Sequence, residues 1–171
     1  MSHKPRYDDL VADEDALPVV TGRAWVFGDH IARAQLVADE HVDGPLTAAA
    51  AHLFAAVDPD FTCRMQRGDF VVAGLDFAAD VTQRIVPAAL KHLGVAAVIA
   101  RSFGRFFLRH AVDAGLAALV VEETGAIRRG DRLRVDVEAH IVANLSSGDR
   151  YVIRNLDDAA IAILRRARVA Q

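Results

Sequence analysis

The residues of this chain best suited to chemistry are histidines, arginines and carboxylates that stand between apolar segments. Two of the seven histidines, His30 and His41, share one loop region with Asp29, Asp39 and Glu40. Imidazole and carboxylate groups bind metals such as zinc, but this spacing matches no common ligand motif. Two interpretations stay open, a metal site or loop polarity that faces solvent, and the second is favoured.

A row of arginines follows in a segment with helical spacing. Arg101, Arg105 and Arg109 recur every four residues, which places them on one side of a helix. Such a row is usually a solvated helix face. The aromatic residues of the segment fall on a different stripe and are expected to pack in the core: Phe103, Phe106 and Phe107. The chain has no recognisable Ser-His-Asp order, paired carboxylates or phosphate-binding glycine loop.

The composition describes an ordinary globular domain. The 171 residues are 53% hydrophobic and 25% charged, with a formal charge of -3 and one cysteine, Cys63. This charge disfavours nucleic acid and anionic membrane as partners. One cysteine cannot hold an iron-sulfur cluster, which needs about three or four such ligands, so cluster chemistry must come from a partner. No apolar run approaches the roughly 20 residues that span a bilayer, and a cytoplasmic protein is expected.

The first half of the chain alternates strand and helix patterns. Residues 1–18 are acidic and without periodicity, and we expect a flexible extension before a single domain at 19–171. Residues 19–27 predict a strand that ends at a Gly-Asp turn. Helical spacing covers 46–57 and should stop before Asp58-Pro59. Residues 70–74 predict a short buried strand.

The second half continues this alternation and then changes. Residues 86–93 predict a helix closed by Gly94, and 95–100 a strand covered on both faces. Ser102 is placed to cap the next helix, which Gly115 ends. Two later segments alternate polar and apolar residues and predict an antiparallel region: 119–123 and 132–145. A final helix is expected to begin near Leu156. The chain is therefore expected to be an α/β domain with a mixed sheet.

Four segments of the chain resemble one family. They are GRAWVFGDHI (22–31), GDFVVAGLDF (68–77), PAALKHLGVAAVIARSFGRFFLRHAVDAGL (87–116) and GDRLRVD (130–136). The chain is similar to the small subunit of 3-isopropylmalate dehydratase, the stand-alone form of the aconitase swivelling domain. The likeness covers about residues 21–168.

The resemblance implies a three-layer β/β/α swivelling domain that docks onto a separate large subunit carrying a 4Fe-4S cluster. The cluster polarises a small hydroxy-acid substrate, and the small subunit supplies a base and a cationic clamp for dehydration and rehydration. No cofactor is expected in this chain. Self-association is left open.

The chain departs from the family where the chemistry should be. Read without gaps, the family's G-S-S-R-E-H falls on residues 80–85, which places its proton-abstracting serine on Val81 and its arginine on Gln83. A slip of one residue gives Thr82 as the hydroxyl and Arg84 as the carboxylate clamp, with Gln83 beside them as a substrate contact.

The family's N-T-D motif is also rewritten, as Ala32-Arg33-Ala34. Arg33 is either a replacement contact for an anionic substrate group or a solvated loop residue. Two functions follow: the small subunit of a hydro-lyase with an altered substrate, or a catalytically silent homologue that acts as a binding or regulatory module. The cation and hydroxyl that remain at 82–84 favour the first.

Overall fold

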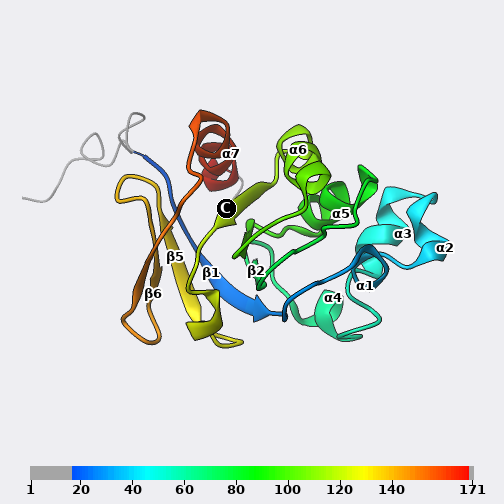
Figure 1. Ribbon diagram of the computed structural model, residues 1–171, viewed down its shortest axis with the longest axis horizontal. Helices are drawn as coiled ribbons and strands as arrows, with labels where there is room; N and C mark the ends of the chain where they lie inside the picture. The colour runs from blue at the N-terminus through cyan, green and yellow to red at the C-terminus, as the bar shows by residue number, and fades with distance from the viewer. Residues whose placement is uncertain (1–16, 170–171) are drawn as a thin grey trace, which may run out of the picture.

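A seven-stranded mixed sheet forms the centre of the protein (Figure 1), in a computed structural model that describes residues 17–169. Residues 1–16 of the expected acidic extension lie outside the described part. The strand order is β4-β3-β2-β1-β5-β6-β7. The strands are β1 (Val19–Val26), β2 (Phe70–Val72), β3 (Ala97–Ala100), β4 (Ala117–Val120), β5 (Arg132–Asp136), β6 (Ile141–Asn144) and β7 (Arg150–Val152).

The sheet has a parallel and an antiparallel half, and β1 belongs to both. β1 runs parallel to β2, with Ala24 opposite Phe70, and antiparallel to β5 on its other side. The predicted antiparallel region is confirmed for β5 and β6. It is wrong for 119–123, because β4 pairs in parallel with β3. A helix between β3 and β4 carries the chain back across the sheet, which parallel pairing requires.

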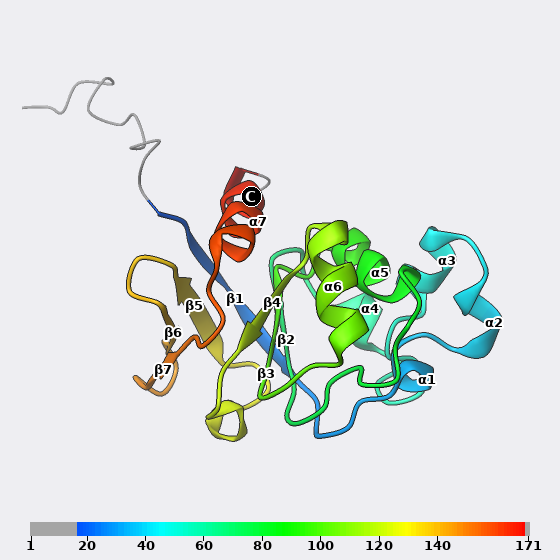
Figure 2. The same ribbon diagram turned by 45° about the horizontal axis from the view of Figure 1, so that its top comes forward.

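The helices are short in the first third of the chain and longer afterwards. They are α1 (Arg33–Leu36), α2 (Asp39–Val42), α3 (Leu46–Ala51), α4 (Phe61–Arg64), α5 (Ile85–Leu93), α6 (Arg105–Ala114), α7 (Asp158–Val169) and a 3-10 turn, η2 (Thr124–Ala126). Figure 2 shows α5 and α6 side by side, with the short helices beyond them and α7 near β1. Within the described residues, no helix is long and apolar enough to cross a bilayer.

Two apolar cores lie on opposite faces of the parallel strands. Val71 and Val98 pack on one face in a cluster that includes Phe107 of α6. Phe70 and Ile99, their neighbours along the strands, pack on the other face in a cluster with β5, β6 and α7. Because successive strand residues point to opposite faces, β3 is buried on both, as its uninterrupted apolar sequence predicts. Helices, parallel strands and the curled antiparallel half together make the expected β/β/α layers.

Some local predictions differ from the structure. The helix expected over 46–57 ends at Ala51, because Phe54 adopts a φ of 59° and its ring stacks on Phe27 at 3.9 Å. Phe106 is 48% exposed rather than buried, although Phe107 is fully buried. The last helix begins at Asp158, two residues later than expected. By contrast, Gly94 and Gly115 close α5 and α6 with φ of 103° and 72°, as predicted.

The carboxylate of Asp69, in the turn before β2, binds Trp25 of β1. This carboxylate, 5% exposed, accepts hydrogen bonds from Trp25 Nε1 at 3.0 Å, from the Gln66 N–H at 2.8 Å and from the Arg23 N–H at 3.1 Å. These bonds tie β1 to the turn before β2. A buried carboxylate needs such donors, so the bonds to Asp69 hold β1 against the turn that leads into β2.

Candidate functional site

The carboxyl ends of the parallel strands meet at one edge of the sheet, where ligands bind in open α/β folds. The segments that leave this edge are 27–32 after β1, 73–84 after β2, 101–104 after β3 and 121–127 after β4. The proposed substrate residues Arg33, Thr82, Gln83 and Arg84 lie in or next to these segments, whereas His41 lies on α2. The fold thus gathers residues that are far apart in the chain.

Hydrogen bonds join the first three segments. Asp29 Oδ1 accepts the Leu75 N–H at 2.7 Å, and the His30 N–H donates to the Leu75 carbonyl at 2.7 Å. The Arg101 N–H donates to the Gly74 carbonyl at 3.0 Å. A Cβ on Gly74 would stand 1.7 Å from Asp29 Oδ1, so this approach requires glycine. The three loops therefore form one connected platform.

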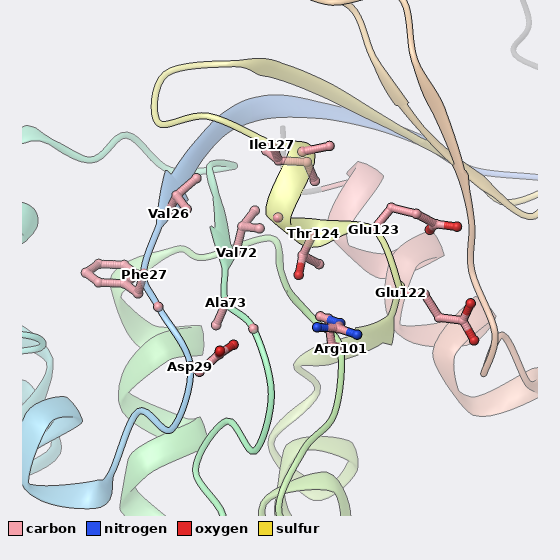
Figure 3. A pocket seen from close by; sticks show the side chains of 14 residues that line it. Val26, Phe27, Asp29, Val72, Ala73, Arg101, Glu122, Glu123, Thr124 and Ile127 are labelled. Carbon is pink, nitrogen blue, oxygen red and sulfur yellow. The ribbon is translucent and has the colours of Figure 1, made fainter.

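A cavity of about 420 Å³ opens between these loops and the segment after β4. Figure 3 shows Asp29, Arg101 and Thr124 around this opening. Glu122 also lines it and pairs with Arg154 at 3.3 Å. The Arg101 guanidinium makes no hydrogen bond or ion pair to another residue within 17–169, so it is free to meet a ligand. The cavity thus offers both a cation and carboxylates.

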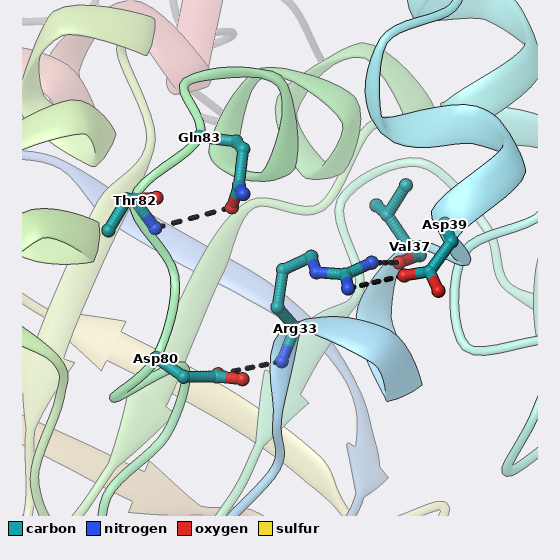
Figure 4. A network of polar contacts seen from close by, with 6 residues as sticks. All are labelled: Arg33, Val37, Asp39, Asp80, Thr82 and Gln83. Atoms are coloured by element: carbon teal, nitrogen blue, oxygen red, sulfur yellow. Dashed lines mark hydrogen bonds and ion pairs between the residues drawn. The ribbon is translucent and has the colours of Figure 1, made fainter.

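The segment that carries Thr82, Gln83 and Arg84 runs along the same edge. Val81 is fully buried in the helix-side core, whereas Thr82 and Arg84 are exposed. The Thr82 N–H donates to Gln83 Oε1 at 3.3 Å (Figure 4). Arg84 is the N-cap of α5, and its guanidinium makes no hydrogen bond or ion pair within residues 17–169. A hydroxyl and a cation therefore face outward, two residues apart.

The backbone of Arg33 is bound to the 80–84 segment. Its N–H donates to Asp80 Oδ1 at 2.8 Å, while its guanidinium donates to the Val37 carbonyl at 2.9 Å and pairs with Asp39 (Figure 4). The side chain is 20% exposed. The structure therefore brings α1 against the 80–84 segment but turns the Arg33 guanidinium toward α2, away from Thr82.

The two loop histidines have separate partners. His41 stacks on His52 with ring centroids 4.4 Å apart, and His30 Nδ1 lies 3.2 Å from Asp76 Oδ2. Over residues 17–169, no three His, Cys, Asp or Glu side chains are grouped so that they could hold a metal ion. Cys63 is exposed on α4. His30 and His41 are therefore not brought together in one group with Asp29, Asp39 and Glu40 in the part of the chain that the structure describes.

The sequence reasoning missed the cluster of His30, Asp76 and Ser102. Ser102 does not cap α6, which begins at Arg105 after Gly104 with no side-chain cap. Instead, the Asp76 N–H donates to Ser102 Oγ at 2.7 Å, and Ser102 Oγ donates to Asp76 Oδ1 at 3.3 Å. Each of these three residues closely follows a strand predicted from the sequence, and this common position is the signal that could have grouped them.

Comparisons with known proteins agree with this architecture. The small subunit 1 of 3-isopropylmalate dehydratase from Archaeoglobus fulgidus is 38% identical over 146 residues, which are 85% of this chain and 91% of the relative. The methanogen homoaconitase small subunit from Methanothermobacter thermautotrophicus is 31% identical over 147 residues, 85% of each chain. No family model matches the chain.

The crystal structure of 3-isopropylmalate dehydratase from Methanocaldococcus jannaschii superposes with a TM-score of 0.78 at 24% identity, over 89% of this chain and 96% of that one. The fold is thus the aconitase-type swivelling domain that the motifs led us to expect. The chain belongs to the family of 3-isopropylmalate dehydratase small subunits. The resemblance drawn from its motifs is confirmed.

Proposed function

We propose that this chain is the small subunit of a hydro-lyase that removes water from, and returns it to, a small hydroxy acid in the cytoplasm. A large subunit carrying a 4Fe-4S cluster completes the enzyme. Bound to the partner, that cluster acts as a Lewis acid on the substrate hydroxyl. The relatives' names support this assignment. The donor set of this chain supports it too, because the single Cys63 cannot ligate a cluster.

The observation that carries the proposal is the contrast between Val81 and its neighbours. Val81 is buried, so it cannot meet a substrate, whereas Thr82 and Arg84 are exposed on a segment that Asp80 fixes to α1. In our assignment the Thr82 hydroxyl contacts the reacting part of the substrate. The Arg84 guanidinium binds its carboxylate through two parallel hydrogen bonds. Gln83 steadies the loop by accepting the Thr82 N–H and is the third contact.

The loop after β1 is the reason that we propose an altered substrate. The family's N-T-D motif is replaced here by Ala32-Arg33-Ala34. The one charged side chain of this replacement is occupied by Val37 and Asp39. A substrate group that the family holds with this motif therefore loses its partners. We propose that the cavity beside Arg101 receives a differently charged substrate end.

The test is to co-express the chain with the cluster-bearing large subunit of its own host and purify without oxygen. We expect a complex that contains iron and sulfide and that hydrates unsaturated acids, followed through the ultraviolet absorbance of the conjugated double bond. Thr82→Val, which removes the hydroxyl at nearly constant shape, should lower kcat. Thr47→Val, on the exposed start of α3, is the matched control. Absence of both complex and turnover would favour the silent homologue.

A further inference from the structure

His30, Asp76 and Ser102 come from the loops after β1, β2 and β3 and meet in one chain of contacts. His30 Nδ1 lies 3.2 Å from Asp76 Oδ2, and the other oxygen of Asp76 lies 3.3 Å from Ser102 Oγ. Asp76 therefore stands between the imidazole and the hydroxyl. This order excludes a serine nucleophile activated by histidine, which needs the imidazole next to the hydroxyl.

The backbone holds the pair in an uncommon conformation. His30 and Asp76 have φ of 56° and 55°, in the left-handed region that residues other than glycine rarely adopt. The loop bonds described above hold both residues, since His30 N–H binds Leu75 and Asp76 N–H binds Ser102. Strain of this kind persists where the surroundings fix it, and it concentrates at functional sites.

The pair closely follows residues that line the cavity. Asp29, Gly74 and Arg101 line that cavity, and each is one or two residues from a member of the pair or from Ser102. The His30 side chain is 68% exposed, so a ligand in the cavity region can approach the ring. Asp76 is the charged group in ion-pair contact with it; the neighbouring Asp29 carboxylate is turned to the Leu75 N–H.

The carboxylate of Asp76 lies beside Nδ1 of His30. A carboxylate in this position favours the tautomer that carries its proton on Nδ1, in which Nε2 keeps its lone pair and can act as a base. The Thr82 hydroxyl, by contrast, has no hydrogen-bond partner among residues 17–169 that could take its proton. An alcohol without a neighbouring base accepts or gives protons poorly near neutral pH. The site proposed above thus needs a base, and His30 can supply it.

We propose that His30 is the proton acceptor of the dehydration and that Asp76 is its positioning residue; this inference rests on the function proposed above. Nε2 takes the proton from the substrate carbon, and the electron pair of that C–H bond forms the C=C bond. The hydroxyl on the adjacent carbon leaves as hydroxide. That hydroxide and the proton on Nε2 together make up the lost water, and the reverse sequence hydrates the double bond.

The first test uses the complex with the large subunit. His30→Asn tolerates the positive φ but cannot act as the base, so kcat should fall about 10²- to 10⁴-fold with little change in KM. The acid limb of the pH profile should disappear with it. Asp76→Asn should lower kcat about 10- to 100-fold and keep that limb, because the imidazole remains.

His140→Asn is the matched control for backbone strain. His140 is exposed and has the same φ of 56°, but it lies in the turn between β5 and β6, at the opposite end of β1. It should keep wild-type kcat and pH profile. Turnover by His30→Asn at the wild-type rate would overturn the proposal and leave the hydro-lyase function standing. Loss of complex formation in His30→Asn would overturn it as well, because His30 would then be a docking contact.

A second readout needs no partner and no substrate. Nitrogen-15 correlation spectra of the isolated chain should show His30 protonated on Nδ1 in its neutral form, and Asp76→Asn should redistribute the proton between the two nitrogens. An Nε2-protonated ring in the wild-type chain would overturn the assignment. Absence of turnover in the wild-type complex would overturn the hydro-lyase function, and the catalytic role of His30 with it.

Discussion

The Asp29 carboxylate reaches 46 residues along the chain to accept the Leu75 N–H at 2.7 Å. It passes over Gly74, where a side chain would collide with it. This contact fixes the loop after β1 to the loop after β2, and both His30 and the 80–84 segment depend on these loops. Asp29, which follows the first strand, and Gly74, which follows the second, therefore take part in the same contact between the two loops.

Gly74→Ala should break this contact. The new methyl would overlap Asp29 Oδ1, so either the carboxylate or the loop must move, and the free energy of unfolding should fall by about 1–3 kcal/mol. Urea unfolding followed by circular dichroism measures the change. Gly125→Ala is the control, because nothing lies within 4 Å of its added Cβ; it should stay within about 0.5 kcal/mol of wild type. Equal effects of the two substitutions would show that Asp29 adjusts freely.

Asp69→Ala should destabilise the sheet more strongly. It removes the acceptor of three buried or half-buried donors, including Trp25 Nε1, at a cost of about 3 kcal/mol. Trp25 is the single tryptophan of the chain, so its fluorescence reports the change directly. Asp43→Ala, at an exposed loop position, should leave stability and spectrum unchanged. A native-like emission maximum in Asp69→Ala would contradict this role.

Much of the fold could be predicted from sequence because local pattern determines it. The apolar run at 95–100 and the glycines that end α5 and α6 act through burial and backbone conformation near themselves. The pairing of β4 could not be predicted in this way. Its four residues are all apolar and only their burial alternates, and they lie parallel to β3 because α6 returns the chain.

The site was predictable only in part, for a related reason. Motif order points to the 80–84 segment, and the burial of Val81 beside the exposed Thr82 is the reason that we propose Thr82. The partner of His30 is 46 residues away in the sequence, and Ser102 was expected at a helix end that Gly104 occupies instead. A Cβ on Gly104 would stand 2.3 Å from the Ala78 carbonyl oxygen, so tertiary contact between loops, absent from local pattern, decided where α6 begins.

Arg84→Ala should weaken use of the substrate without unfolding the chain. The guanidinium is exposed and has no partner among the described residues, so stability should hold, while kcat/KM of the complex should fall about 10- to 100-fold. Arg84→Lys should recover little, because an ammonium cannot form two parallel bonds to a carboxylate. Arg109→Ala, on the exposed side of α6, is the matched loss of charge. Equal kcat/KM in Arg84→Ala and Arg109→Ala would remove Arg84 from the site.

Asp131 should make the stability of the chain depend on acid pH. The Arg128 N–H, at 2.9 Å, and then the Asn144 amide, at 2.8 Å, hold the pKa of its carboxyl below the ordinary value, aided by the Arg128 charge and partly opposed by burial. A lowered pKa in the folded state means that the ionised group stabilises the protein above the unfolded-state pKa. This contribution is lost as the pH falls below about 4 and through the folded-state pKa.

Asp131→Asn keeps an amide oxygen as acceptor and removes the charge. It should therefore be less stable than wild type near neutral pH, and the difference should shrink as the pH falls below about 4. Urea unfolding at a series of pH values measures both curves. Glu138→Gln, at an exposed position in the turn before β6, should give a curve parallel to that of wild type. A difference for Asp131→Asn that stays constant down to acid pH would mean that the charge of Asp131 contributes nothing and that only the shape of the turn matters.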